Sequence, residues 1–343
     1  MIKKSLLFFF SFTCLLISAQ QSKIDSLLNM GICDINGFCI PNIANMSRPK
    51  GISIIQQSTL DYGITSKFRD SIAKQNGEIR HNESVEIKLK FPLILKKQTQ
   101  IFMGLNYRNE EFEFENSNQL QSEFHRHLEE KPLRTVGSTI YLDKRFKGRH
   151  YFYTRVSFSL NGDFNDGKAF NYFRSSVTSL YGTKVSASKT WGYGLSYSYR
   201  FGRLALYPIL HYNKQFNKKW GFEALLPLKT EFRYQPNEKN YFYLINRLNG
   251  ANYVLTFDQL TDKNLFLAYS EFISMVTYER EIYDFLWFTV SAGMRANFRF
   301  DLTESNTVIN NDEPLVRNTL NQAPLIRFGI FIVPPKRFMN KHR

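Results

Sequence analysis

The stretch WGYGLSYSYRFG, residues 191–202, decides the fold because large and small side chains alternate along it. A period of two predicts a β-strand with one bulky apolar face and one small polar face. The apolar face must be covered either by a protein core or by lipid. Features elsewhere in the chain distinguish between these two alternatives.

The first residues have the pattern of an export signal. Lys3 and Lys4 precede an apolar run of about signal-peptide length, and Ala19 fits a cleavage site. We therefore predict a signal peptide over residues 1–19. A lipoprotein attached through Cys14 is the alternative, but the residues before it form a poor lipobox. No later run approaches the ~18 apolar residues that mark a membrane helix.

Residues 20–50 are predicted to form a periplasmic N-terminal segment. Cys33 and Cys39 flank an Asn-Gly dipeptide, which favours a tight turn that brings them close. Exported compartments permit disulfides, so a small disulfide loop is the preferred interpretation. A metal site is disfavoured because no histidine or further cysteine lies nearby.

Composition and charge narrow the class of protein. Aromatic residues make up 16% of the chain, including 32 Phe and 19 Tyr, and they favour pleated, half-buried surfaces. The net charge of +15 on an exported chain points to anionic lipid head groups or anionic solutes, with a basic surface of no particular role as the alternative. An aromatic-rich exported chain without long apolar runs is typical of a membrane β-barrel.

The alternation recurs almost everywhere after residue 50. It holds in VEIKLKFPLILK, residues 85–96, and over 220–234, where we predict one strand with a bulge at Pro227. Strands this long suit tilted membrane crossings, and about a dozen of them enclose a lumen too wide for bulky side chains to fill. We therefore expect lipid to cover the apolar face, and a soluble secreted sandwich is the alternative.

The predicted fold is all-β, a transmembrane antiparallel up-and-down β-barrel over residues 51–333, followed by a basic tail over 334–343. Counting gives about thirteen candidate strands, and a bacterial barrel requires an even number. We expect about twelve strands, with fourteen as the alternative. Short turns should lie on the periplasmic side and longer polar loops outside. The longer connections lie near 66–82, 115–134, 164–176 and 302–322.

The alternation also assigns side chains to lipid or to the lumen. The lipid-facing candidates of the opening stretch are Trp191, Tyr193, Leu195, Tyr197, Tyr199 and Phe201. The lumen-facing candidates are Glu86, Lys88, Lys90, Arg155, Arg200, Glu223, Lys229, Glu231, Arg233, Arg295, Arg299 and Arg327. Basic side chains around a lumen favour anions. The alternative is a lumen closed by Arg–Glu pairs, and we expect it to be narrow or closed.

The segment 191–234 carries a family resemblance. GLSYSYRFGRLALYPIL followed by WGFEALLPLKTEFRY resembles the outer-membrane barrels grouped as domain of unknown function 6268, and the resemblance covers most of the chain after residue 50. The residues that carry it are Gly202, Pro208, Trp220, Pro227 and Tyr234. It implies an outer-membrane barrel without an assigned activity. Many barrels end in a terminal Phe used for assembly, and here only Phe331 or Phe338 can stand in.

Two polar runs raise the question of metal binding. EFHRHLEEK places His125 and His127 beside three glutamates, which makes a metal site one interpretation and a solvated external loop the favoured one. NEEFEFEN, residues 109–116, has carboxylates suited to calcium, but we favour the polar top of a strand. We predict no metal and no cofactor.

Catalysis in a barrel needs a Ser–His or Asp–His arrangement. His150 and His211 lie in or beside strands, and neither has a sequence neighbour that completes a triad. We therefore predict no enzymatic activity. The expected role is a narrow, porin-like pore for small solutes or a structural barrel in a Gram-negative outer membrane. The alternative is a barrel-embedded hydrolase acting on lipid or peptide. Expected partners are outer-membrane lipid and the barrel-assembly machinery, and not nucleic acid.

Overall fold

The computed structural model describes residues 49–71, 73–96, 98–115, 122–146, 148–165, 169–257, 265–304 and 313–334. The predictions for the signal peptide, for the Cys33–Cys39 loop and for most of the basic tail lie outside these ranges and stay predictions.

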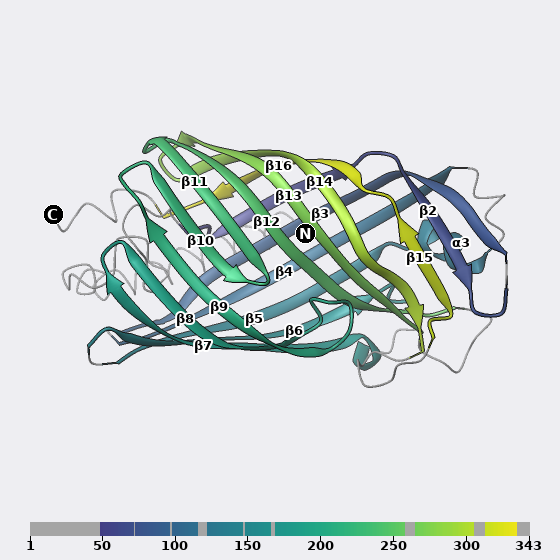
Figure 1. Cartoon of the computed structure of the whole chain (residues 1–343), viewed down its shortest axis with the longest axis horizontal. Helices are drawn as coiled ribbons and strands as arrows, with labels where there is room; N and C mark the ends of the chain where they lie inside the picture. The colour runs from purple at the N-terminus through teal and green to yellow at the C-terminus, as the bar shows by residue number, and fades with distance from the viewer. Residues whose placement is uncertain are drawn as a thin grey trace, which may run out of the picture.

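β-Strands dominate the described chain (Figure 1). The strands are β1 (Ile52–Thr59), β2 (Tyr62–Phe68), β3 (Lys74–Leu95), β4 (Thr99–Glu115), β5 (Leu133–Arg145), β6 (His150–Gly162), β7 (Phe173–Ser186), β8 (Lys189–Ser198), β9 (Ala205–Gln215), β10 (Trp220–Leu226), β11 (Lys229–Asn237), β12 (Asn240–Leu255), β13 (Leu265–Tyr283), β14 (Leu286–Thr303), β15 (Val316–Leu320) and β16 (Ala323–Ile332). The helices are α3 (Glu123–Glu130) and the 3-10 helix η1 (Ala169–Tyr172). Neither described helix has the length and apolar character needed to span a membrane.

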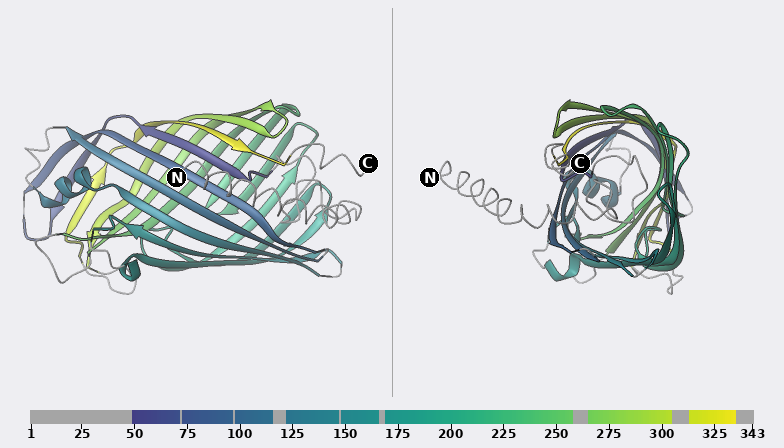
Figure 2. Two further views of the ribbon diagram at one scale, coloured as in Figure 1. Left: turned by 180° about the vertical axis from the view of Figure 1, so that it is seen from behind. Right: turned by 90° about the vertical axis from the view of Figure 1, so that its left-hand side faces the viewer.

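The strands form one sheet that closes on itself (Figure 2). β1 and β2 follow each other along β3, and β15 and β16 follow each other along β14, so each pair occupies a single position in the wall. Sixteen strands thus fill fourteen antiparallel positions. The predicted barrel is confirmed, and its number of strand positions is the alternative value of fourteen and not twelve.

The hairpin β10–β11 corrects the single strand predicted over 220–234. The chain turns at Pro227 and Leu228, where the Leu228 N–H donates to the Leu225 carbonyl at 2.7 Å and Leu225 pairs with Lys229. Pro227 therefore marks a turn and not a bulge. Bulky residues alternate straight through this turn, which is why periodicity alone did not reveal it.

The two ends of the barrel differ. β1 begins and β16 ends at the same end, where Ile52 pairs with Ile332; we call this the terminus end. Short turns join β3–β4, β5–β6, β7–β8, β9–β10, β11–β12 and β13–β14 there. The longer connections and α3 lie at the opposite end, which we call the loop end (Figure 2). Short turns are typical of the periplasmic side of bacterial barrels.

The exterior of the wall is apolar. On β8, Tyr193 and Leu195 expose 57% and 55% of their surface outward, whereas Ser196 is buried on the inner face. β9 and β16 present similar exposed residues, among them Leu206 and Phe328. Lipid requires an apolar outer face. It also requires a closed sheet, because closure gives every backbone N–H and C=O of the wall a hydrogen-bond partner.

The opening stretch leaves the regular pattern earlier than predicted. β8 ends at Ser198, and the Gly202 N–H donates to the Tyr199 carbonyl at 2.9 Å, with Gly202 at a φ of +79° that favours glycine. Tyr199 lies beside the Arg174 guanidinium, and Phe201 packs edge-on against Tyr207. The regular outward stripe therefore ends at Tyr197, although Phe201 remains 37% exposed.

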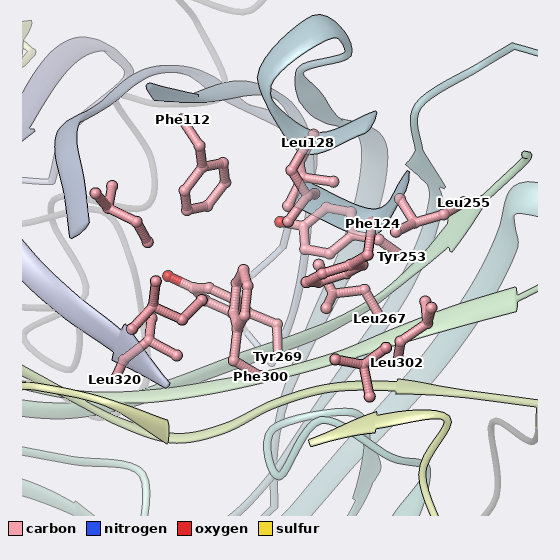
Figure 3. Close-up of a cluster of buried hydrophobic side chains, with 14 of the residues drawn as sticks. Phe112, Phe124, Leu128, Tyr253, Leu255, Leu267, Tyr269, Phe300, Leu302 and Leu320 are labelled. Atoms are coloured by element: carbon pink, nitrogen blue, oxygen red, sulfur yellow. The ribbon is translucent and has the colours of Figure 1, made fainter. Parts of the chain in front are cut away.

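The loop end is filled by a hydrophobic core (Figure 3). Phe124 and Leu128 of α3 pack among Phe112, Tyr269 and Phe300 from the surrounding strands. All five side chains are less than 4% exposed. The expectation of a solvated loop around His125 and His127 is therefore wrong: the segment folds into a helix, because its apolar residues find partners inside the barrel.

Candidate functional site

A polar cavity of about 790 Å³ lies inside the barrel between this core and the terminus end. It reaches from Arg108, Tyr253 and Tyr269 near the core to Lys50 and Glu279 near the terminus end. Ten basic and four acidic side chains line it: Lys50, Lys88, Lys90, Arg108, Arg155, Arg174, Arg200, Lys229, Arg247 and Arg327, with Glu86, Glu223, Glu231 and Glu279. The lining is therefore strongly electropositive.

Ion pairs neutralise part of this charge. Lys88 lies 2.7 Å from Glu86, whose second oxygen is 3.8 Å from Arg327. Lys229 pairs with Glu231, and Lys50 pairs with Glu279. Each acidic side chain of the lining is thus paired with a basic one, and the ten basic side chains outnumber the four acidic ones.

Three arginines, Arg155, Arg200 and Arg247, line the cavity close to one another. Arg200 and Arg247 form no ion pair with any side chain that the structure describes, and the Arg247 Nε has no hydrogen-bond partner. Arg155 donates its Nε to the Ser157 hydroxyl at 3.2 Å. Arg200 lies close enough to Arg155 and Arg247 for their charges to interact. Like charges in a confined space repel one another, and an anion between them would relieve this repulsion.

Hydroxyl groups form the wall of the cavity on β5, β6 and β7. Thr139 is the register partner of Ser157, and Ser157 is the register partner of Ser176, so the three lie in one row across neighbouring strands. The hydroxyls of Thr139 and Ser157 are 3.0 Å apart. Ser159 lines the same wall. This wall offers donors and acceptors without charge.

A buried ionic layer separates the cavity from the core. Arg295 is 1% exposed and lies 3.7 Å from both Glu110 and Glu271. Its guanidinium also donates to the Tyr62 hydroxyl at 2.5 Å, and Arg108 pairs with Glu110 at 2.9 Å. Charges removed from water in this way are held in place by their partners, so the layer is rigid.

His125 anchors α3 inside the core. The Ser122 hydroxyl lies 2.7 Å from its Nδ1 and the Ser66 hydroxyl 2.9 Å from its Nε2. Ser66 donates to Asn318 at 2.5 Å, so both ring nitrogens are satisfied by a neutral imidazole that accepts from Ser122 and donates to Ser66. Burial lowers the pKa of His125 to about 4, because the charged form loses its hydration.

His127 ties α3 to the wall. Its Nε2 lies 2.8 Å from Asp163 at the end of β6, and Asp163 also accepts from the Thr256 N–H at 2.7 Å and from the Tyr172 hydroxyl at 3.2 Å. The helix thus closes the loop end through a packed core and a hydrogen-bonded latch.

The structure places most of the predicted lumen-facing residues in the cavity lining. Nine of the twelve lie there: Glu86, Lys88, Lys90, Arg155, Arg200, Glu223, Lys229, Glu231 and Arg327. Arg295 lies in the ionic layer, and Arg233 is buried inside, 3.4 Å from Glu223.

Arg299 is the exception, and the assignment to the lumen is wrong. The register of β13 and β14 shifts between Ser270 and Glu271, so Phe298 is an extra residue. Beyond this bulge the faces exchange: Phe300 enters the core, and Arg299 lies on the opposite face, with its Nη1 3.5 Å from the Phe201 carbonyl. A one-residue slip turns every following side chain to the other face.

Sequence reasoning missed Arg247 and Arg108. Arg247 lies in a segment where asparagines and leucines occupy both faces, so no clear alternation marked it. The signal was the row Tyr241, Tyr243 and Ile245, which precedes Arg247 on the inner face of β12. Arg108 alternates with the exposed Leu105 and Tyr107, so the period of two could have predicted that it faces the lumen.

The two candidate catalytic histidines each contact a hydroxyl group of another strand. The His211 Nδ1 lies 2.8 Å from the Tyr151 hydroxyl, and the His150 Nδ1 lies 3.1 Å from the Thr183 hydroxyl. Ser66 and His125 form a Ser–His pair, but both side chains are fully buried. Within the described ranges no group of three or more His, Cys, Asp or Glu is placed to hold a metal ion.

The family model described as domain of unknown function 6268 matches residues 53–330, which confirms the resemblance. None of the curated proteins matches the sequence. A FadL homologue from Pseudomonas aeruginosa is similar in structure, with 7% identity, a TM-score of 0.40, and coverage of 83% of this chain and 90% of that one.

Two further solved structures are similar. The translocator domain of the autotransporter NalP from Neisseria meningitidis has 10% identity, a TM-score of 0.34, and coverage of 94% of this chain and 97% of that one. The toluene transporter TodX from Pseudomonas putida has 10% identity, a TM-score of 0.30, and coverage of 82% and 89%. Scores this low carry no argument about function.

Proposed function

Because the chain belongs to the family of domain of unknown function 6268, whose name assigns no activity, we propose a function from the lumen itself. The protein is an outer-membrane β-barrel, and we propose that it passes small anionic solutes. The observation that carries this proposal is the cavity with ten basic and four acidic side chains. Basic side chains around a water-filled path attract anions and repel cations.

In this proposal the loop end controls passage. The core around Phe124 and Leu128 closes that end, so solute moves through only when α3 leaves its position. The ionic layer around Arg295 lies directly beneath and belongs to the same barrier. Small conductance is therefore expected at rest.

Current measurements across a planar bilayer test the proposal. Refolded protein under a KCl gradient should give discrete steps whose reversal potential shows preference for chloride. Arg155→Glu combined with Arg247→Glu should move the reversal potential toward potassium, because both side chains line the cavity. Lys218→Glu, in the exposed β9–β10 turn, is the control with the same type of charge change and should leave selectivity nearly unchanged. Cation preference in the unmodified protein would contradict the proposal.

The absence of catalysis stays a prediction, as do the barrel-assembly machinery and outer-membrane lipid as partners. Hydrolysis of lipid or peptide by the purified protein, lost in His150→Ala or His211→Ala, would reverse the first of these.

A further inference from the structure

We propose that the cavity holds a binding site for a hydroxyl-bearing organic anion, such as a sugar phosphate or a sugar carboxylate, with its charged group on Arg200 and Arg247. This inference rests on the proposed passage of anions and names the class of solute.

The two arginines are suited to the charged group. Each carries a planar guanidinium that can donate two parallel hydrogen bonds to a phosphate or a carboxylate. Neither has an ion pair among the side chains that the structure places, since the four acids of the lining pair with Lys50, Lys88, Lys229, Arg233 and Arg327. Glu86 and Glu271 also act on Arg247, but Glu86 lies 2.7 Å from Lys88 and 3.8 Å from Arg327, and Glu271 lies 3.7 Å from Arg295. The charge of the two arginines is therefore left for a ligand.

The hydroxyl wall is suited to the rest of the ligand. Ser157 and Ser176 lie in register on neighbouring strands, and Ser159 follows on the same inner face of β6. Hydroxyl groups can donate to and accept from sugar hydroxyls, which a wall of cations alone cannot do. Arg155 projects from the same strand and connects this wall with the arginines.

The volume of the cavity favours an organic ligand. About 790 Å³ lies in the range of pockets that bind small molecules and is far larger than a single inorganic anion needs. Apolar ligands are disfavoured, because they would leave the charges of the lining without partners.

Calorimetric titration of the full barrel in detergent micelles tests the site with glucose 6-phosphate, gluconate, inorganic phosphate and glucose as probes. We expect glucose 6-phosphate and gluconate to bind, phosphate to bind at least about tenfold more weakly, and glucose not to bind. Arg200→Gln and Arg247→Gln should each weaken glucose 6-phosphate binding roughly 10- to 100-fold, the effect expected for hydrogen bonds to a charged group. Lys218→Gln should have no effect.

A second pair of variants separates the two halves of the site. Ser159→Ala with Ser176→Ala should weaken glucose 6-phosphate and leave phosphate unchanged. The faster gel mobility of unheated protein checks that each variant is folded. Equal affinity for phosphate and glucose 6-phosphate, or affinity unchanged in both arginine variants, would overturn the proposal.

The outcomes also separate this proposal from the proposed function. Anion-selective current without binding of either sugar anion removes the site and leaves passage standing. Binding without current removes passage and leaves a site in a closed barrel.

Discussion

At the scale of single residues, partners decide what a side chain does. His125 lies in a run that looks like a solvated loop in the sequence, and Arg299 lies in one that looks like a regular strand. His125 is enclosed by the rings of Phe114 and Phe124, with centroids 5.3 Å away in each case. Arg299 is turned out of the lumen by the bulge at Phe298, the residue directly before it. Neither outcome can be read from residue type, because the first depends on packing inside the barrel and the second on the register between β13 and β14.

His125 gives a prediction for pH. Its pKa is about 4 when α3 is docked and about 6.5 when α3 is released, so the released state binds the proton more tightly. The free energy that holds α3 docked should be at its full value above about pH 6.5 and should fall by about 2 kcal/mol at pH 5, because the released state takes up the proton. Amide hydrogen exchange of α3 at pH 7 and pH 5, corrected for intrinsic rates, measures this loss.

The control for this prediction is His125→Gln, which keeps hydrogen-bonding capacity and cannot titrate in this range. Its exchange should respond much less to pH. Equal protection of α3 at both pH values in the unmodified protein would show that His125 does not govern docking.

At the scale of elements, α3 and the hairpin β10–β11 set the character of the barrel. The hairpin raises the strand number to an even value and brings Glu223, Glu231 and Arg233 together inside. α3 fills the loop end, where its buried residues join strands from both sides of the barrel. One element shapes the wall, and the other closes the path through it.

Replacing residues 122–131 with a Gly-Ser segment of equal length should increase conductance severalfold, because Phe124 and Leu128 leave the core and the His127–Asp163 latch is lost. The same bilayer recordings measure this change. The matched control is Glu129→Gln with Glu130→Gln, which alters only the exposed face of α3. If the replaced chain gives no more current than the control, α3 is not the closure of the lumen.

At the scale of the whole molecule, the wall around the cavity is the reverse of a soluble protein, with an apolar outer face and charged side chains on the inner face. Leu206 is 65% exposed and Phe328 56% exposed on the wall, whereas Arg233 and Arg295 are at most 1% exposed inside it. Burying a large apolar side chain in lipid stabilises by about 1.5–3 kcal/mol, and this gain exists only in a membrane. Outside the membrane the same surface would associate.

Fluorescent labels test this orientation. In a chain that starts at Gln20 and carries serine at positions 33 and 39, fluorescent labels on Leu195→Cys and Leu206→Cys should be quenched strongly by nitroxide lipids in reconstituted vesicles. A cysteine at Ser196, which is 1% exposed and faces inward, should be quenched far less. Similar quenching at Leu195 and Ser196 would contradict the placement of the β8 faces.

The sequence by itself determined the wall of this protein. A strand in lipid needs alternating faces, so the period of two predicted the barrel, the outward stripe from Trp191 to Tyr197 and nine residues of the cavity lining. Only the tertiary structure decided the interior. Periodicity is local and passes unchanged through the turn at Pro227. The fold of α3 arises from contacts across the lumen, and the exchange of faces at Phe298 arises from a register shift between β13 and β14. The contacts of Phe124 and Leu128 with Tyr269 and Phe300 join segments more than a hundred residues apart, and no short pattern in the chain records them.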